Sequence, residues 1–195
     1  TLASKVPVGV LDAKGVVIGI EETQRGSVTT TTAVAYARKK LKKSKFILPK
    51  LEIDTASEDP DAEAKAAAAK ESFEAALARS GVVELDGLSG NITGRFRVMD
   101  WGLTVYLEND QVLARVGDTT NIKALPVVKD FAKLGGKCQG TREDFLLSVV
   151  ALQSERAVGV VVESSCSPTD AARLKTRVRR FVVASVSSIV PLNPI

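Results

Sequence analysis

Hydrophobic and polar residues alternate along much of the chain, which is the period of β-strands that bury one face. The alternation over residues 6–10 resumes over 16–20 after the turn residues Asp12-Ala13-Lys14-Gly15, and this predicts a β-hairpin. The run from Ser27 to Ala37 is rich in β-branched Thr and Val and predicts a third strand. A fourth strand is predicted from Phe46 to Asp54, with Leu51 and Ile53 on one face.

The composition changes at residue 57, and a helix is predicted over residues 59–80. Ser57-Glu58-Asp59-Pro60-Asp61 places capping residues, acids and an early proline where a helix begins, and Gly81 suits its end. Small apolar residues recur at helical spacing between these signals: Ala62, Ala66, Ala69, Phe73, Ala76 and Leu77. A stripe of this kind predicts close packing against a neighbouring element.

Alternation returns over residues 91–117 and predicts a meander of three antiparallel strands. The C-terminal region, 122–195, is predicted to mix helices and strands. One short helix enters at Pro126 and ends at Gly135-Gly136, and a second starts at Thr141. Val158 to Glu163 indicates a buried strand, whereas Ser167-Pro168-Thr169-Asp170 predicts a helix that runs to about Arg180. The last residues, from Val182 on, indicate a closing strand.

These elements predict an α+β fold with a mainly antiparallel sheet of about eight to ten short strands, one Ala-rich helix and two or three further helices. A jelly-roll-like β-sandwich with helical insertions is the alternative. We expect residues 1–195 to form one domain. Its parts are an N-terminal β region (1–54), the Ala-rich helix (59–80), the β meander (91–117) and a C-terminal α/β region (122–195).

The overall composition, 45% hydrophobic and 26% charged, is that of a folded protein rather than a disordered one. No apolar run reaches the roughly 18 residues that a membrane-spanning helix needs, so we expect no membrane span. The N-terminal residues lack the basic and then apolar layout of a secretory signal. A cytoplasmic or virion-like location is therefore predicted.

Histidine is absent, which excludes His-dependent triads and His-containing zinc sites within this chain. Cys138 and Cys166 lie outside any C-x-x-C spacing, so they predict no metal or redox motif. Two cysteines in a chain of this size favour thiols in a reducing compartment over a disulfide between them. The glycine-rich stretch 135–141 lacks the residue order of a phosphate loop. We predict no catalytic residue, no metal and no cofactor.

The net charge is only +4, but the positive residues are gathered. No acid occurs from Thr23 to Leu51, and the acids Glu52 to Glu63 follow at once. The central part of the basic stretch supplies the first predicted nucleic-acid-binding cluster: Arg38, Lys39, Lys40, Lys42, Lys43 and Lys45. Such a run is either a solvated face balanced by acids elsewhere on the fold or a segment that contacts phosphates.

A second basic cluster makes the phosphate interpretation more attractive. Arg173, Arg177 and Arg180 have helical spacing, and Arg179 lies beside them. The planar guanidinium group can bind phosphate through two hydrogen bonds, although it also suits a carboxylate-rich protein. Trp101, Tyr36 and Tyr106 are not interleaved with either cluster, so contact through charge is expected rather than sequence reading.

The resulting hypothesis is a structural, coat-protein-like subunit that associates with copies of itself and contacts nucleic acid non-specifically. The abundance of Val, Thr and Ala and the scarcity of aromatic residues, 5%, suit packing and association more than a ligand pocket. A monomeric or dimeric accessory module that binds nucleic acid or protein is the second hypothesis. The third is a His-free enzyme that uses a metal and carboxylates around the meander: Asp100, Glu108, Asp110 and Asp118.

Overall fold

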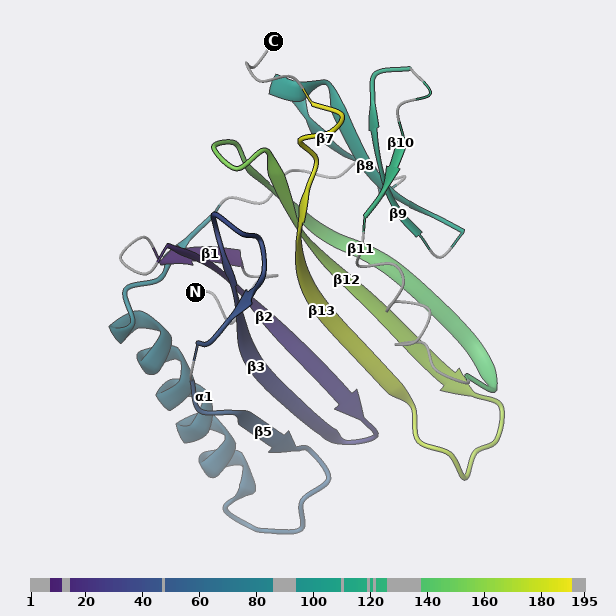
Figure 1. Ribbon diagram of the computed structural model, residues 1–195. Helices are drawn as coiled ribbons and strands as arrows, with labels where there is room; N and C mark the ends of the chain where they lie inside the picture. Colours follow the sequence, from purple (N-terminus) through teal and green to yellow (C-terminus); the bar gives the residue numbers. More distant parts are fainter. Residues whose placement is uncertain are drawn as a thin grey trace.

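Two antiparallel β-sheets and one long helix make up the described part of the protein (Figure 1). The computed structural model describes residues 8–11, 15–46, 48–85, 94–109, 111–118, 120, 122–125 and 138–190. The larger sheet has nine strands in the order β11-β12-β13-β2-β1-β6, and β3 pairs with β2, β4 and β5. Its strands are β1 (Val8–Leu11), β2 (Val16–Arg25), β3 (Val28–Ala37), β4 (Lys43–Ser44), β5 (Leu51–Asp54), β6 (Val83–Glu84), β11 (Gly140–Leu152), β12 (Ala157–Pro168) and β13 (Thr176–Ser185).

The smaller sheet has four strands in the order β10-β9-β8-β7. They are β7 (Phe96–Val98), β8 (Leu103–Glu108), β9 (Gln111–Val116) and β10 (Ile122–Ala124), and a 3₁₀ turn, Met99–Trp101, joins the first two. The inward side chains pack on β11, β12 and the C-terminal end of β13. Trp101, Leu103 and Val105 meet Val149 and Val160 in one buried cluster. This cluster attaches the smaller sheet to one face of the larger sheet.

The larger sheet is joined across β13 and β2 at one end only. Backbone pairing between these strands covers Thr176–Arg179 against Glu22–Arg25 and then stops. Beyond that point a second buried cluster lies between the two halves of the sheet. It contains Val17 and Tyr36 from the first half, and Val161, Phe181 and Val183 from the second.

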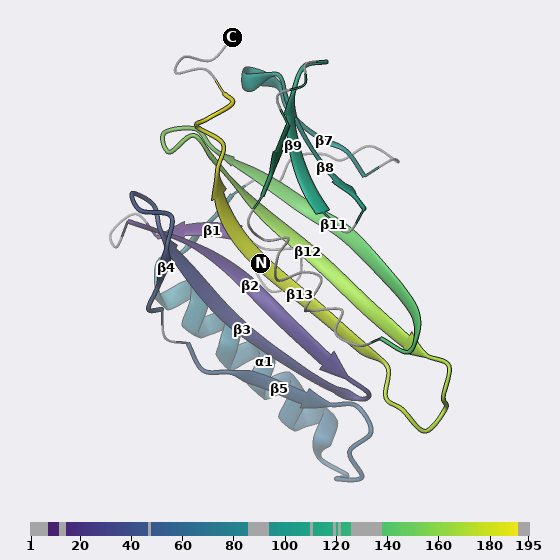
Figure 2. The ribbon, with the colours of Figure 1, turned by 45° about the vertical axis from the view of Figure 1, so that its right-hand side comes forward.

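Helix α1 (Ala62–Arg79) covers the opposite side of the N-terminal strands, as Figure 2 shows. Phe73 and Leu77 are its two buried side chains, and they pack with Ile20 of β2 and Leu51 of β5. The small residues on the same side allow the helix backbone to approach the sheet. The predicted Ala-rich helix and its close packing are therefore confirmed.

The mainly antiparallel sheet is also confirmed, because every strand pair in the described ranges is antiparallel. The N-terminal hairpin, the third strand, the meander and the buried strand at 158–163 all occur. Of the strand predicted from Phe46 to Asp54, β5 holds only Leu51–Asp54. The predicted closing strand forms as far as Ser185, after which the chain turns. The jelly-roll alternative is wrong, because most neighbouring strands are consecutive hairpin strands rather than Greek-key partners.

Two predicted helices are strands. The segment from Thr141 belongs to β11, which pairs along its length with β12, and Arg142 and Asp144 form an ion pair on one strand face instead of a capping box. The segment before Arg180 belongs to β13, which has β12 on one side and β2 on the other. Sheet pairing on both edges overrides the helical spacing of the arginines. The helix predicted from Pro126 lies outside the described residues.

Of the apparent helix cap Ser167-Pro168-Thr169-Asp170, the first two residues end β12, and Thr169 and Asp170 begin the turn towards β13. The Asp170 carboxylate accepts a hydrogen bond from the backbone N–H of Ala172 at 2.9 Å, and its carbonyl accepts one from Arg173 at 3.0 Å. Asp often stabilises such turns because its side chain reaches the backbone two residues on. Asp170 therefore stabilises a turn here rather than the start of a helix.

Cys138 and Cys166 form a disulfide, with their Cα atoms 5.8 Å apart. The expectation of reduced thiols is wrong. Cys166 lies on β12 opposite Arg142 of β11, and Cys138 lies just before β11 begins. The bond thus fastens the open end of the β11–β12 hairpin. Because stable disulfides belong to oxidising environments, the cysteine count gives no support to a reducing compartment.

Candidate nucleic-acid interface

The first basic cluster lies in a tight loop after β3. The backbone N–H of Leu41 donates to the carbonyl of Ala37 at 2.7 Å, and that of Ala37 donates to the carbonyl of Lys42 at 2.8 Å. Leu41 has a positive φ of 51° and packs against the cluster that contains Tyr36. The chain then returns along β3 as β4, with Lys43 opposite Tyr36. Leu41 is thus the anchor of the loop, and the lysines around it point to solvent.

We call the lysines of this segment the lysine loop: Lys39, Lys40, Lys42, Lys43 and Lys45. All of them are exposed, and none forms an ion pair with a described residue. The loop borders a shallow pocket of about 320 Å³ between β3 and Phe46. Its positive charge is consequently open to a ligand.

Arg38, at the start of the same segment, differs from the lysines. Its Nε lies 2.8 Å from Oε1 of Glu155, and both side chains are partly covered. Glu155 belongs to the turn between β11 and β12, 117 residues further along the chain. Arg38 therefore connects two parts of the fold rather than extending the exposed positive surface.

The acidic segment that follows has its own partners. The Ser27 hydroxyl donates to Asp54 at 2.7 Å, and this bond, followed by the Ala56 N–H, lowers the pKa of the Asp54 carboxyl. The pKa of Asp59 is lowered first by Lys65 of α1 and then by a backbone N–H. Among the residues placed by the structure, these acids do not neutralise the lysine loop.

The second basic cluster is mostly neutralised by its own chain. Arg177 forms ion pairs with Glu22 and Glu163, and Arg179 lies 3.7 Å from Glu163. Arg180 donates to the Thr23 hydroxyl at 3.1 Å and to the carbonyl of Glu22 at 3.3 Å. These arginines lie on the central strand β13, so Arg180 projects from the face opposite Arg177 and Arg179.

Arg173 is the exception within the second cluster. It lies in the loop before β13, its side chain is 54% exposed, and among the described residues it pairs with Asp170 at 4.0 Å. The helical face that would have joined it to Arg177 and Arg180 does not exist. The two predicted clusters thus differ: every lysine of the lysine loop is exposed, whereas Arg173 is the one exposed arginine of the second cluster.

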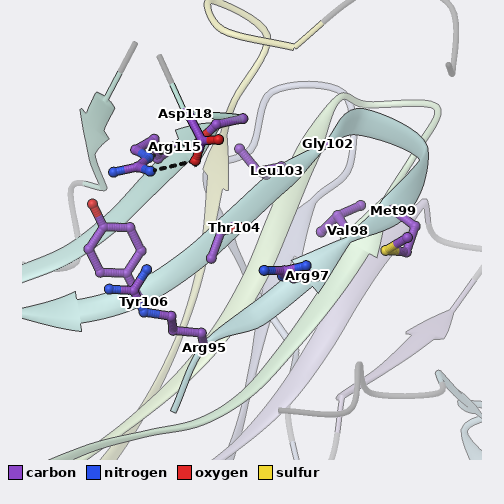
Figure 3. A pocket seen from close by; sticks show the side chains of 11 residues that line it. Arg95, Arg97, Val98, Met99, Gly102, Leu103, Thr104, Tyr106, Arg115 and Asp118 are labelled. Carbon is purple, nitrogen blue, oxygen red and sulfur yellow. Dashed lines mark hydrogen bonds and ion pairs between the residues drawn. The ribbon is translucent and has the colours of Figure 1, made fainter. Parts of the chain in front are cut away.

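A third basic group was missed by the sequence reasoning. Arg95 and Arg97 flank Phe96 near β7, and Arg115 lies on β9. With Tyr106 and Asp118 they line a pocket of about 330 Å³, which Figure 3 shows from close by. The signal was the alternation itself: Phe96 and Val98 point inward, so Arg95 and Arg97, which alternate with them, must point outward.

Two of the carboxylates named for a metal-dependent enzyme have partners of their own in the described part of the chain. Asp100 accepts a hydrogen bond from Gln153 at 2.6 Å, and Asp118 pairs with Arg115 at 3.2 Å. Asp110 lies outside the described residues. In the ranges that the structure places, no group of three or more Cys, Asp or Glu residues could hold a metal ion. No helix among these ranges is long and apolar enough to cross a membrane.

Comparison of the chain with protein families, with curated proteins and with solved structures finds no match.

Proposed function

We propose that this protein is a structural subunit that associates with copies of itself and holds nucleic acid through the lysine loop. The observation that carries the proposal is the exposure of five neighbouring lysines without an acidic partner among the described residues. On the strands of the larger sheet, by contrast, Arg142, Arg177 and Arg179 pair with acids of the same chain. Lysine ammonium groups neutralise phosphates and release counterions without reading bases.

Self-association has its best support at the edge strand β11. This strand is 13 residues long, and only β12 pairs with it in the described part of the chain. Phe145 on β11 is 48% exposed, although it is a large apolar side chain. An open sheet edge offers unpaired N–H and C=O groups to a second chain. A second copy that adds its own β11 would satisfy these groups and cover Phe145.

The binding half of the proposal is tested by replacing Lys39, Lys40, Lys42 and Lys43 with Gln. The matched control replaces four exposed basic residues elsewhere, namely Lys50, Lys70, Arg79 and Lys175, and has the same net charge. Affinity for a short DNA duplex is measured by fluorescence anisotropy between about 50 and 200 mM salt. The slope of the logarithm of the binding constant against the logarithm of the salt concentration should become shallower by up to about four in the loop variant. It should change little in the control. Equal losses in both variants would refute the lysine loop as the binding surface.

The assembly half is tested by light scattering of the wild type and of Phe145→Glu. A charged side chain at this position would oppose its own copy across the shared edge, so the mass of the particle should fall. Met99, which is 78% exposed in the 3₁₀ turn between β7 and β8, provides a control as Met99→Glu. A wild-type protein that is monomeric at micromolar concentration overturns this half of the proposal.

A further inference from the structure

The outer face of the smaller sheet carries arginines in neighbouring positions. Arg97 of β7 pairs with Thr104 of β8, and Thr104 pairs with Arg115 of β9. These three side chains therefore form one row across three strands, facing away from the core. Their neighbours Val98 and Leu103 are buried on the other face. The sheet thus fixes two guanidinium groups on either side of a hydroxyl.

The next row holds an arginine on an aromatic ring. The guanidinium carbon of Arg95 lies over the ring of Tyr106, 4.9 Å from its centroid, as seen in Figure 3. Tyr106 itself is only 6% exposed, so the surface that a ligand meets here is the guanidinium group. A guanidinium plane held by an aromatic ring is a stacking surface for a nucleobase. The ring also restricts the arginine in advance, which lowers the entropy that binding would cost.

The described residues that line this pocket include three arginines, Arg95, Arg97 and Arg115, and one acid, Asp118. Asp118 and the carbonyl of Gly117 hold Arg115 in place at 3.2 and 3.0 Å, while the Asp118 side chain is fully exposed. The pocket volume of about 330 Å³ is near the lower end of the range for small ligands. Its size suits one nucleotide unit rather than the width of a duplex.

We infer that this pocket binds an unpaired nucleotide of single-stranded nucleic acid. Arg97 and Arg115 contact the phosphates on either side of Thr104, and the base stacks on the guanidinium group that Tyr106 supports. An acidic peptide could pair with the same arginines, but its carboxylates would not stack on the guanidinium plane of Arg95. A duplex keeps its bases paired and cannot place one on Arg95. The inference rests on the proposed function in that its ligand is nucleic acid, but its site is separate from the lysine loop.

The test compares two single strands of about ten nucleotides, one of thymidines and one abasic, which carry the same number of phosphates. Wild-type protein should bind the thymidine strand about 5- to 100-fold more tightly, which is the effect of stacking one base. Arg95→Lys keeps the charge but removes the planar group, so it should bring this ratio close to one. Arg97→Gln should weaken binding of both strands equally. Arg79→Lys, at the exposed end of α1, is the matched control and should change neither value.

Folding of each variant is checked by its thermal unfolding midpoint, so a lost ratio in a folded protein can be assigned to the site. A wild-type ratio of one, or a ratio that Arg95→Lys leaves intact, overturns the inference. Stronger competition by polyglutamate than by the thymidine strand would assign the pocket to an acidic peptide instead.

The same measurements separate this inference from the proposed function. Substitution of the lysine loop should weaken both strands and leave their ratio unchanged. If that variant binds as the wild type does while the ratio persists, the lysine loop is wrong and the pocket stands. If the wild type binds duplex in a salt-dependent manner without distinguishing the two strands, the pocket is wrong and the lysine loop stands.

Discussion

Gly19 of β2 and Phe181 of β13 fit together so closely that a Cβ atom on Gly19 would lie 2.1 Å from the phenyl ring. Gly159 of β12 leaves similar room on the other side, where an added Cβ would lie 3.0 Å from the ring. Phe181 is fully buried, so it cannot move aside. The two glycines therefore let one aromatic ring fill the space where the two halves of the larger sheet diverge.

Gly19→Ala should destabilise the protein by about 1–3 kcal/mol or more, because the added methyl group overlaps a ring that has no free space around it. Urea unfolding measures the loss. The double variant Gly19→Ala/Phe181→Leu should lose less than the sum of the two single variants, since the smaller side chain makes room for the methyl group. Additive losses, or a Gly19→Ala protein as stable as the wild type, would contradict this close fit.

Phe181 also depends on side chains for its backbone hydrogen bonds. Its N–H donates to Oε2 of Glu21 at 3.0 Å, and its carbonyl accepts from the Tyr36 hydroxyl at 3.3 Å. Pairing of β13 with β2 ends two residues earlier, at Arg179. Beyond the last backbone pair between β13 and β2, the side chains of Glu21 and Tyr36 thus provide the hydrogen bonds that the N–H and C=O groups of Phe181 need.

Burial, and secondly the charge of Glu21, raises the pKa of Tyr36 from 10.0 to about 12. The folded protein keeps this proton at pH values where the unfolded chain has lost it. The resulting stability is complete below pH 10 and is lost as the pH rises towards 12. Tyr36→Phe should cost about 1 kcal/mol at pH 7 through the lost hydrogen bond. Its stability should then fall less steeply between pH 10 and 12 than that of the wild type, as urea unfolding at each pH would reveal. Parallel alkaline losses in both proteins would exclude Tyr36 as the titrating group.

Reduction of the Cys138–Cys166 bond should lower the free energy of unfolding. The bond closes a loop with a sequence separation of 28, for which chain entropy gives about 3–4 kcal/mol. Urea unfolding with and without a phosphine reductant measures the difference. Cys138→Ser/Cys166→Ser is the control, because it should match the reduced wild type and ignore the reductant. Two free thiols in the mass spectrum of the untreated protein would disprove the bond.

Strands with one buried face were predictable, because alternation records which side of a strand meets the core. Phe96 and Val98 show this for β7, and Val112 and Ala114 for β9. The errors fell where local signals competed with distant pairing. Asp170 has the sequence context of a helix cap, but the residues after it form β13 because they pair with β12 and β2. The disulfide joins residues whose proximity depends on the register of the β11–β12 hairpin, which no spacing in the sequence specifies.

The candidate sites divide in the same way. Lys39 to Lys45 could be chosen from the sequence because a loop between strands leaves consecutive lysines exposed. The ion pairs of Arg177 could not be predicted, since its partners Glu22 and Glu163 come from two other strands. The stack of Arg95 on Tyr106 depends on the exact register between β7 and β8, which the predicted meander does not specify.

The contrast between the two predicted clusters can be measured directly on Arg177 and Arg179. Arg177→Gln/Arg179→Gln removes both ion-pair partners of the half-buried Glu163 carboxylate, so it should lower the free energy of unfolding by about 1–3 kcal/mol. Because these guanidinium groups are already neutralised, the affinity for duplex DNA should change less than twofold, about 0.4 kcal/mol. Arg173→Gln, in the exposed loop, should leave stability unchanged. A large loss of DNA affinity in a double variant as stable as the wild type would contradict this prediction. It would show that Arg177 and Arg179 bind DNA and that phosphates displace Glu22 and Glu163.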